Sequence, residues 1–173
     1  ARVARVEKQL SKPVASWLIA KKLPRLAKKG GGNLPESWVS FLLWRQSMHG
    51  AMAVDPEARP MWEKIDRAKA ADFGVAVLEQ FMASKQDAKD KWALAIGGLL
   101  GDGRTVKILR PAIDQWAAKS RGALAEHAAT AIALVDSEVA LAMVDDIANA
   151  YRVKNKNIGA AASAAFEAAA TAR

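Results

Sequence analysis

The sequence has 173 residues, of which 26 are Lys or Arg, 18 are Asp or Glu, two are His and none is Cys. This length corresponds to about one domain and is long enough to bury a core. Without Cys, the chain has no disulfides, thiolate zinc sites, iron–sulfur clusters or cysteine nucleophiles, and two His leave little material for a metal site. We therefore expect no cofactor and no metal. No apolar run approaches the roughly 20 residues of a membrane span, so we expect a soluble, cytoplasmic protein.

The composition favours an all-α fold. Alanine supplies 38 of the 173 residues, and no segment alternates apolar and polar residues with a period of two. Hydrophobic residues make up 51% of the chain and six residues are Trp, which excludes a disordered chain. Because alanine side chains are small, we expect helices that approach one another closely.

Residues 1–30 read as a basic N-terminal helical segment. A short amphipathic helix is expected over 2–11, and a second helix is expected from Pro13 to about Lys22, before Pro24 breaks it. Gly30-Gly31-Gly32 then predicts a flexible joint. It lacks the following Lys and Ser or Thr of a phosphate-binding loop.

Residues 33–173 read as a helical-repeat domain. Gly101-Asp102-Gly103 predicts a tight turn, for which glycine would supply a positive φ. The expected helices cover, in chain order, residues 36–52, 61–65, 72–82, 87–100, 104–119, 120–135, 138–151 and 156–172.

Two units in this domain are similar. Residues 92–117 overlay on 127–151 with an offset of about 35, which places Trp116 on Tyr151. The clearest repeats are therefore expected at 87–119 and 120–151. Two helices per unit at this period predict antiparallel hairpins stacked as a short HEAT-like α-solenoid, with an irregular helical bundle as the alternative.

The run Lys89-Asp90-Lys91-Trp92, the Gly101-Asp102 turn and the aliphatic helix that ends at Trp116 resemble a pattern in large bacterial proteins, the MolR-like (molybdate metabolism regulator-like) family. The resemblance covers roughly residues 13–172 and is most specific over 87–117. Since that domain is uncharacterised, the resemblance implies a helical-repeat segment of a longer bacterial protein, and it does not imply that this piece senses molybdate. The chain also begins at Ala rather than Met, from which we expect a processed or excised piece of a longer protein.

The charge is concentrated at one end. Residues 1–30 carry nine Lys or Arg against one Glu, so they account for the whole formal charge of +8. Such a cluster indicates a contact with nucleic acid or an acidic partner, and the alternative is a solubilising surface. The candidate polyanion or partner contacts are Lys21, Lys22, Arg25, Lys28 and Lys29.

Trp92 and Trp116 are the candidate surface aromatics because each borders charged residues. The other Trp residues are expected in the core. We interpret His127 and His49 as structural residues, and Asp145-Asp146 does not predict a metal clamp, because neighbours in a helix point about 100° apart.

No catalytic set emerges, so the sequence predicts a non-catalytic interaction scaffold, whose partner is a protein or a neighbouring domain of a longer chain. The alternative is a module that binds nucleic acid weakly, with Asp114 as the acid of an alkylation-repair glycosylase in its most specific form. A third hypothesis is electrostatic attachment of residues 2–29 to an anionic membrane surface.

Overall fold

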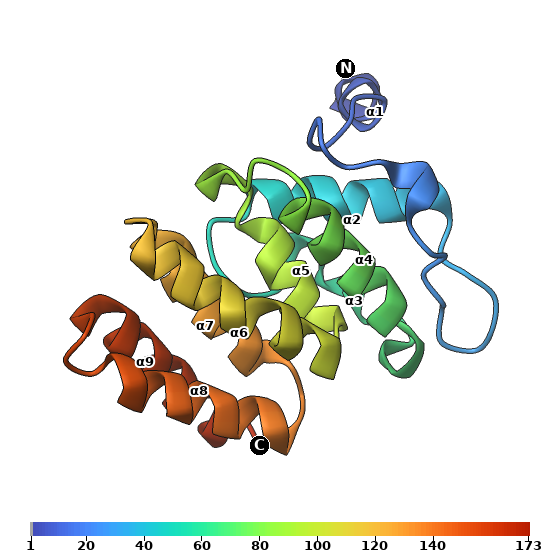
Figure 1. Ribbon diagram of the computed structural model, residues 1–173. Helices are drawn as coiled ribbons and strands as arrows, with labels where there is room; N and C mark the ends of the chain where they lie inside the picture. The colour runs from blue at the N-terminus through green and yellow to red at the C-terminus, as the bar shows by residue number, and fades with distance from the viewer. Residues whose placement is uncertain (1) are drawn as a thin grey trace.

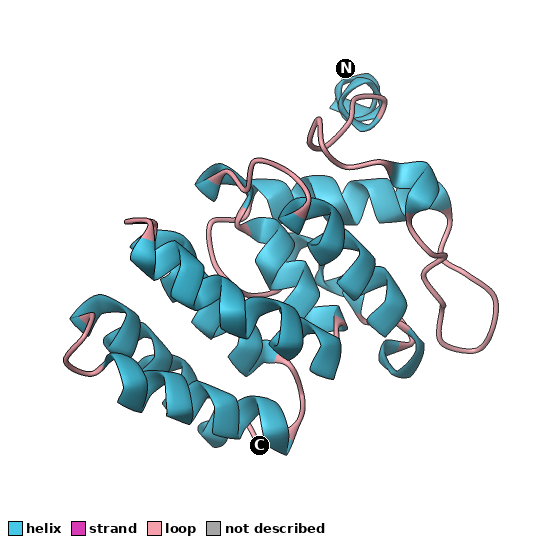
Figure 2. Cartoon of the chain, in the orientation of Figure 1, coloured by secondary structure: helices cyan, strands magenta, loops and turns pink. Residues whose placement is uncertain are grey.

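The computed structural model describes residues 2–173, except for the side chains of Arg2, Val3 and Glu7. Across these residues the regular structure is helical, with two isolated bridges and no strand (Figure 2). The all-α prediction is confirmed. The helices are α1 (Arg2–Leu10), α2 (Glu36–Met48), α3 (Arg59–Trp62), α4 (Ala71–Met82), α5 (Trp92–Leu100), α6 (Gly103–Ala118), α7 (Gly122–Leu134), α8 (Glu138–Tyr151) and α9 (Lys156–Thr171). Four 3₁₀ turns lie between them, at Ala20–Lys22, Pro56–Ala58, Arg67–Lys69 and Ala88–Asp90.

The last six helices form three stacked pairs (Figure 1). α4 packs on α5, α6 on α7 and α8 on α9, and the short connections make the helices of each pair antiparallel. α5, α7 and α9 also pack on one another in order, which makes them one layer, while α4, α6 and α8 form the other layer. α2 and α3 cover the beginning of the stack.

This packing shows how the sequence repeats relate to the helix pairs. The unit 87–119 contains α5 and α6, and the unit 120–151 contains α7 and α8, so each unit joins helices that belong to neighbouring packed pairs. Equivalent helices of one layer begin at Ala71, Gly103 and Glu138, which agrees with the period read from the sequence.

Polar side chains cap the N-termini of several helices. Asp102 accepts a hydrogen bond from the backbone N–H of Arg104 at the start of α6, and Ser137 accepts one from Ala140 at the start of α8. Asn155 does the same for α9. These caps satisfy N–H groups that have no partner inside the helix, so they fix where each helix of the stack begins.

The layer of α5 and α7 depends on a very close approach between the two helices. Eight of the nine residues of α5 are buried. A Cβ atom placed on Gly98 would lie 2.3 Å from the backbone oxygen of Ala131 on α7. Only glycine therefore fits here, since a side chain of any size would push the two backbones apart.

Glycine is required at position 101 for a different reason from the one that the sequence suggested. Its φ is −76°, so the expected positive φ is wrong. A Cβ atom there would lie 2.0 Å from the backbone oxygen of Gly97, which already accepts a 2.8 Å hydrogen bond from the hydroxyl of Thr105. Glycine is needed because the chain passes too close to the end of α5 for a side chain.

The predicted helix from Pro13 to Lys22 is wrong, since only the 3₁₀ turn Ala20–Lys22 forms there. The chain instead lies across α4. Gln80 accepts a hydrogen bond from the backbone N–H of Ile19 at 2.6 Å and donates one to the backbone oxygen of Ile19 at 3.2 Å. These bonds use backbone groups that a helix would have paired internally.

The three glycines form the tip of a hairpin-like loop. Ala27 and Asn33 form a bridge across its base, and Gly30, Gly31 and Gly32 all have positive φ. Leu26 and Leu34, on the two sides of the loop, are buried in the same core as the stacked helices. The segment on each side of the glycines therefore packs onto one common core.

We predict that Gly98→Ala lowers the free energy of unfolding by about 2 kcal/mol, because overpacking outweighs the better helix propensity of alanine. Denaturant unfolding measures this change. The matched control is Gly103→Ala, where a Cβ atom meets nothing within 4 Å and the expected change is within about 0.5 kcal/mol. Equal stability of the Gly98→Ala variant and the wild type would contradict the close contact between α5 and α7.

Candidate functional site

The five basic candidates are all exposed, but they divide between two places. Lys21 and Arg25 line an apolar cleft of about 170 Å³, and Arg25 also pairs with Glu36 at 2.8 Å. Lys28 and Lys29 lie on the glycine loop. The structure therefore does not bring the five residues together as one patch.

The glycine loop places Lys29 against a different part of the chain. Lys28 forms a bridge with Ile65, and the backbone N–H of Lys29 donates to the backbone oxygen of Lys64 at 2.9 Å. As a result, Lys29 joins Arg59 and Arg67 around a hollow of about 360 Å³. Nothing in the local sequence indicated this grouping, because 38 residues separate Lys29 from Arg67 and a non-helical segment brings them together.

Trp92 was expected at the surface, and this is wrong, since it is only 3% exposed. Its ring stacks on Trp17 at a centroid distance of 5.5 Å. The indole N–H groups of Trp17 and Trp92 both donate to the carboxylate of Asp90, at 2.9 and 3.2 Å. The charged neighbour of Trp92 in the sequence is therefore its buried hydrogen-bond partner, and the pair fastens residues near Trp17 to α5.

The expectation for Trp116 is wrong for a similar reason, since this residue is also 3% exposed. Its indole N–H donates to the side-chain oxygen of Gln86 at 2.9 Å, and Arg121 donates to the backbone oxygen of Gln86. Gln86 has a φ of 55° in the turn between α4 and α5. Trp116 and Arg121 therefore hold this turn onto the next helix pair.

Asp114, the candidate glycosylase acid, has a similar structural environment. The hydroxyl of Tyr151 on α8 donates to its carboxylate, and Arg110 forms an ion pair with it at 2.9 Å. Burial opposes ionisation of Asp114, but the contacts with Tyr151 and Arg110 together outweigh it and hold the pKa below its usual value. The carboxylate links α6 to α8.

Neither histidine forms an ion pair with an acid among the described residues. His127 is half-buried on α7, and burial together with the nearby charge of Lys91 lowers its pKa. His49 forms the C-cap of α2. Asp145 and Asp146 are both exposed, and the described residues contain no group of three or more potential metal ligands.

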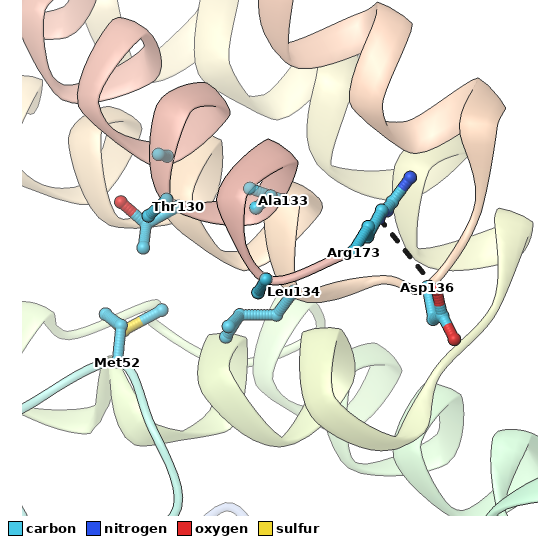
Figure 3. A pocket seen from close by; sticks show the side chains of 10 residues that line it. Met52, Thr130, Ala133, Leu134, Asp136 and Arg173 are labelled. Carbon is cyan, nitrogen blue, oxygen red and sulfur yellow. Dashed lines mark ion pairs between the residues drawn. The ribbon is translucent and has the colours of Figure 1, made fainter.

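A groove of about 420 Å³ runs between the ends of α7 and α9. Figure 3 shows Met52, from the segment after α2, across from Thr130, Ala133 and Leu134 of α7, with Arg173 beside Asp136 at one end. Ala165, Ala168, Ala169 and Ala172 supply the lining from α9. The lining of the groove consists mainly of methyl groups, so the groove can accommodate apolar groups. It offers no nucleophile next to a base.

Comparison with protein-family models, curated proteins and solved structures finds no match. The MolR-like resemblance therefore stays a prediction. Over the described part of the chain, no helix combines the length and the apolar character that crossing a membrane requires.

Tyr151 provides a direct test of the link between α6 and α8. Burial, and then its hydrogen bond to Asp114, raise the pKa of Tyr151 to about 12, against about 10 for an unfolded tyrosine. The folded state thus prefers the protonated hydroxyl. Its contribution to stability is present below about pH 10 and is lost as pH rises towards 12.

Because Tyr151 is the only tyrosine, the ultraviolet absorbance of its phenolate reports this pKa alone. We predict a midpoint of about 12 while tryptophan fluorescence shows the chain to be folded. Asp114→Asn should lower the midpoint, since the negative charge that opposes ionisation is gone, although burial keeps it above about 10. A wild-type midpoint of about 10 in the folded protein would contradict the Tyr151–Asp114 contact.

Proposed function

We propose that this chain is a non-catalytic scaffold, a HEAT-like stack of helix pairs that binds a partner protein or a neighbouring domain of a longer chain. The observation that carries the proposal is the alanine-lined groove of about 420 Å³ between α7 and α9. Its lining suits an apolar segment of a protein. The proposal includes the MolR-like assignment, which rests on residues 87–117.

The use of the polar side chains supports a scaffold. Asp90 binds two indole groups, Gln86 binds Trp116, and Asp114 binds Tyr151 and Arg110. Each of these groups connects elements of the stack. General acid–base catalysis requires groups that are free to exchange protons with a substrate, and these carboxylates are already engaged.

The shape and composition of the groove define the partner. Alanine side chains present a shallow apolar surface, and Met52 adds a flexible side chain that can adapt to different contacts. Arg173 and Asp136, paired at 3.9 Å, supply opposite charges at one end. An apolar helix or extended segment with a polar residue at one end would complement this lining.

The experiment compares capture of partners by variants of the intact chain. We predict that the chain, immobilised and incubated with a cell lysate from its own source, enriches a defined protein, and that Ala168→Gln reduces this enrichment at least tenfold. Ala168 lines the groove, so the larger polar side chain would fill it and leave an unpaired amide against an apolar partner. Quantitative mass spectrometry measures the enrichment.

The matched control is Ala170→Gln, which makes the same change at an exposed position of α9 outside the groove. This variant should retain the partner. Equal loss in both variants, or equal retention in both, would contradict the groove as the contact surface. Detection of substrate turnover by the purified chain would contradict the non-catalytic proposal.

A second candidate function is binding of nucleic acid through the exposed lysines. Lys21, Lys22, Lys28 and Lys29 have no carboxylate ion-pair partner among the described residues, so their charges are available to phosphates. Base excision is not favoured by the structure, because Asp114 is held by Tyr151 and Arg110.

A further inference from the structure

The hollow beside the glycine loop is distinct from the groove between α7 and α9. Its lining consists of three cations, one acid, Val54 and Trp62, and its volume is about 360 Å³. The cations are Lys29, Arg59 and Arg67, and the acid is Glu63. The side chains that line this hollow therefore carry a net charge of +2.

These cations come from separate segments that the fold holds in place. The backbone of Lys29 is fixed to Lys64, Arg59 begins α3, and Arg67 belongs to the following 3₁₀ turn. The guanidinium of Arg67 lies 5.7 Å from the centre of the Trp62 ring, and Trp62 is itself buried. The backbones that carry these cations, and the guanidinium of Arg67, are therefore positioned before any ligand arrives, which reduces the entropy lost on binding.

The charges of the hollow are largely uncompensated. No ion pair involves Lys29, Arg59 or Arg67 among the described residues, in contrast to Arg45, whose guanidinium pairs with Asp55 and Glu57. The indole N–H of Trp62, although buried, has no hydrogen-bond partner in the same part of the chain. Arg67 donates one hydrogen bond, of 3.5 Å, to the backbone oxygen of Leu99. Its remaining N–H groups, together with those of Arg59, Lys29 and the Trp62 indole, form a cluster of donors suited to an anion rich in acceptor oxygens.

We propose that this hollow binds the phosphate group of a small phosphorylated molecule. The guanidinium groups of Arg59 and Arg67 can both bind the same phosphate group through paired N–H donors, and Lys29 adds a third positive charge. The volume matches a small ligand rather than a macromolecular surface. This proposal is independent of the scaffold function, because the groove and the hollow share no residue.

The test titrates the intact chain with pyrophosphate and, separately, with inorganic phosphate at constant ionic strength, by isothermal titration calorimetry. The expected result is saturable binding of pyrophosphate at one site, weakened tenfold or more by Arg59→Gln and by Arg67→Gln, since each removes charge-assisted hydrogen bonds. In parallel, one of the six indole N–H signals in the nitrogen-15 NMR spectrum should shift with the same affinity.

The matched control is Lys107→Gln, which removes one exposed positive charge on α6 outside the hollow. It should leave the affinity unchanged. Arg59→Gln keeps the test valid if Arg67→Gln unfolds, because the guanidinium that lies over the buried Trp62 ring is that of Arg67. Absence of saturable binding, or equal weakening by Lys107→Gln, would overturn the site.

An arm with a short DNA duplex separates the two kinds of phosphate ligand. The small-molecule proposal predicts that duplex binding, if present, is unaffected by Arg59→Gln and remains strongly salt-dependent. A duplex that binds through Arg59 and Arg67 while pyrophosphate does not bind would overturn the proposal in favour of a nucleic-acid surface.

Discussion

The stack depends on how closely α5 and α7 approach each other at Gly98. A backbone oxygen of α7 occupies the space where a side chain of α5 would begin. Because α5 is almost entirely buried and touches α4 on one side and α7 on the other, a displacement there would separate two of the three helix pairs. Alanine also allows close approach along α7 and α9, where the small methyl side chains keep the helices of this layer near one another.

Polar side chains have a second, complementary role in this thin fold. Alanine contacts are short-ranged and similar along a helix, so they specify little about how one pair is placed on the next. Hydrogen bonds from Trp116 to Gln86 and from Tyr151 to Asp114 are directional and join consecutive pairs. We interpret them as the contacts that fix the register of the stack. This accounts for polar residues that look like candidates for chemistry in the sequence and are structural in the fold.

The helices were predictable because apolar residues recur with helical spacing and because N-caps such as Ser137 mark where helices begin. The segment after Pro13 was not, since Gln80, more than sixty positions away, supplies its backbone partners. Proximity to charge in the sequence suggested that Trp92 is exposed, whereas the charged neighbour Asp90 is buried with it. The hollow containing Lys29 depends on a loop that docks on residues 64–66, which local patterns do not encode.

Native-state hydrogen exchange tests the central claim, that the contact of α5 with α7 forms the most stable part of the stack. The claim predicts that backbone amides of α5 and α7 exchange most slowly, with an opening free energy equal to that of global unfolding, while the amides of α1 exchange through local opening. Amides of α5 that exchange as fast as those of α1 would contradict it.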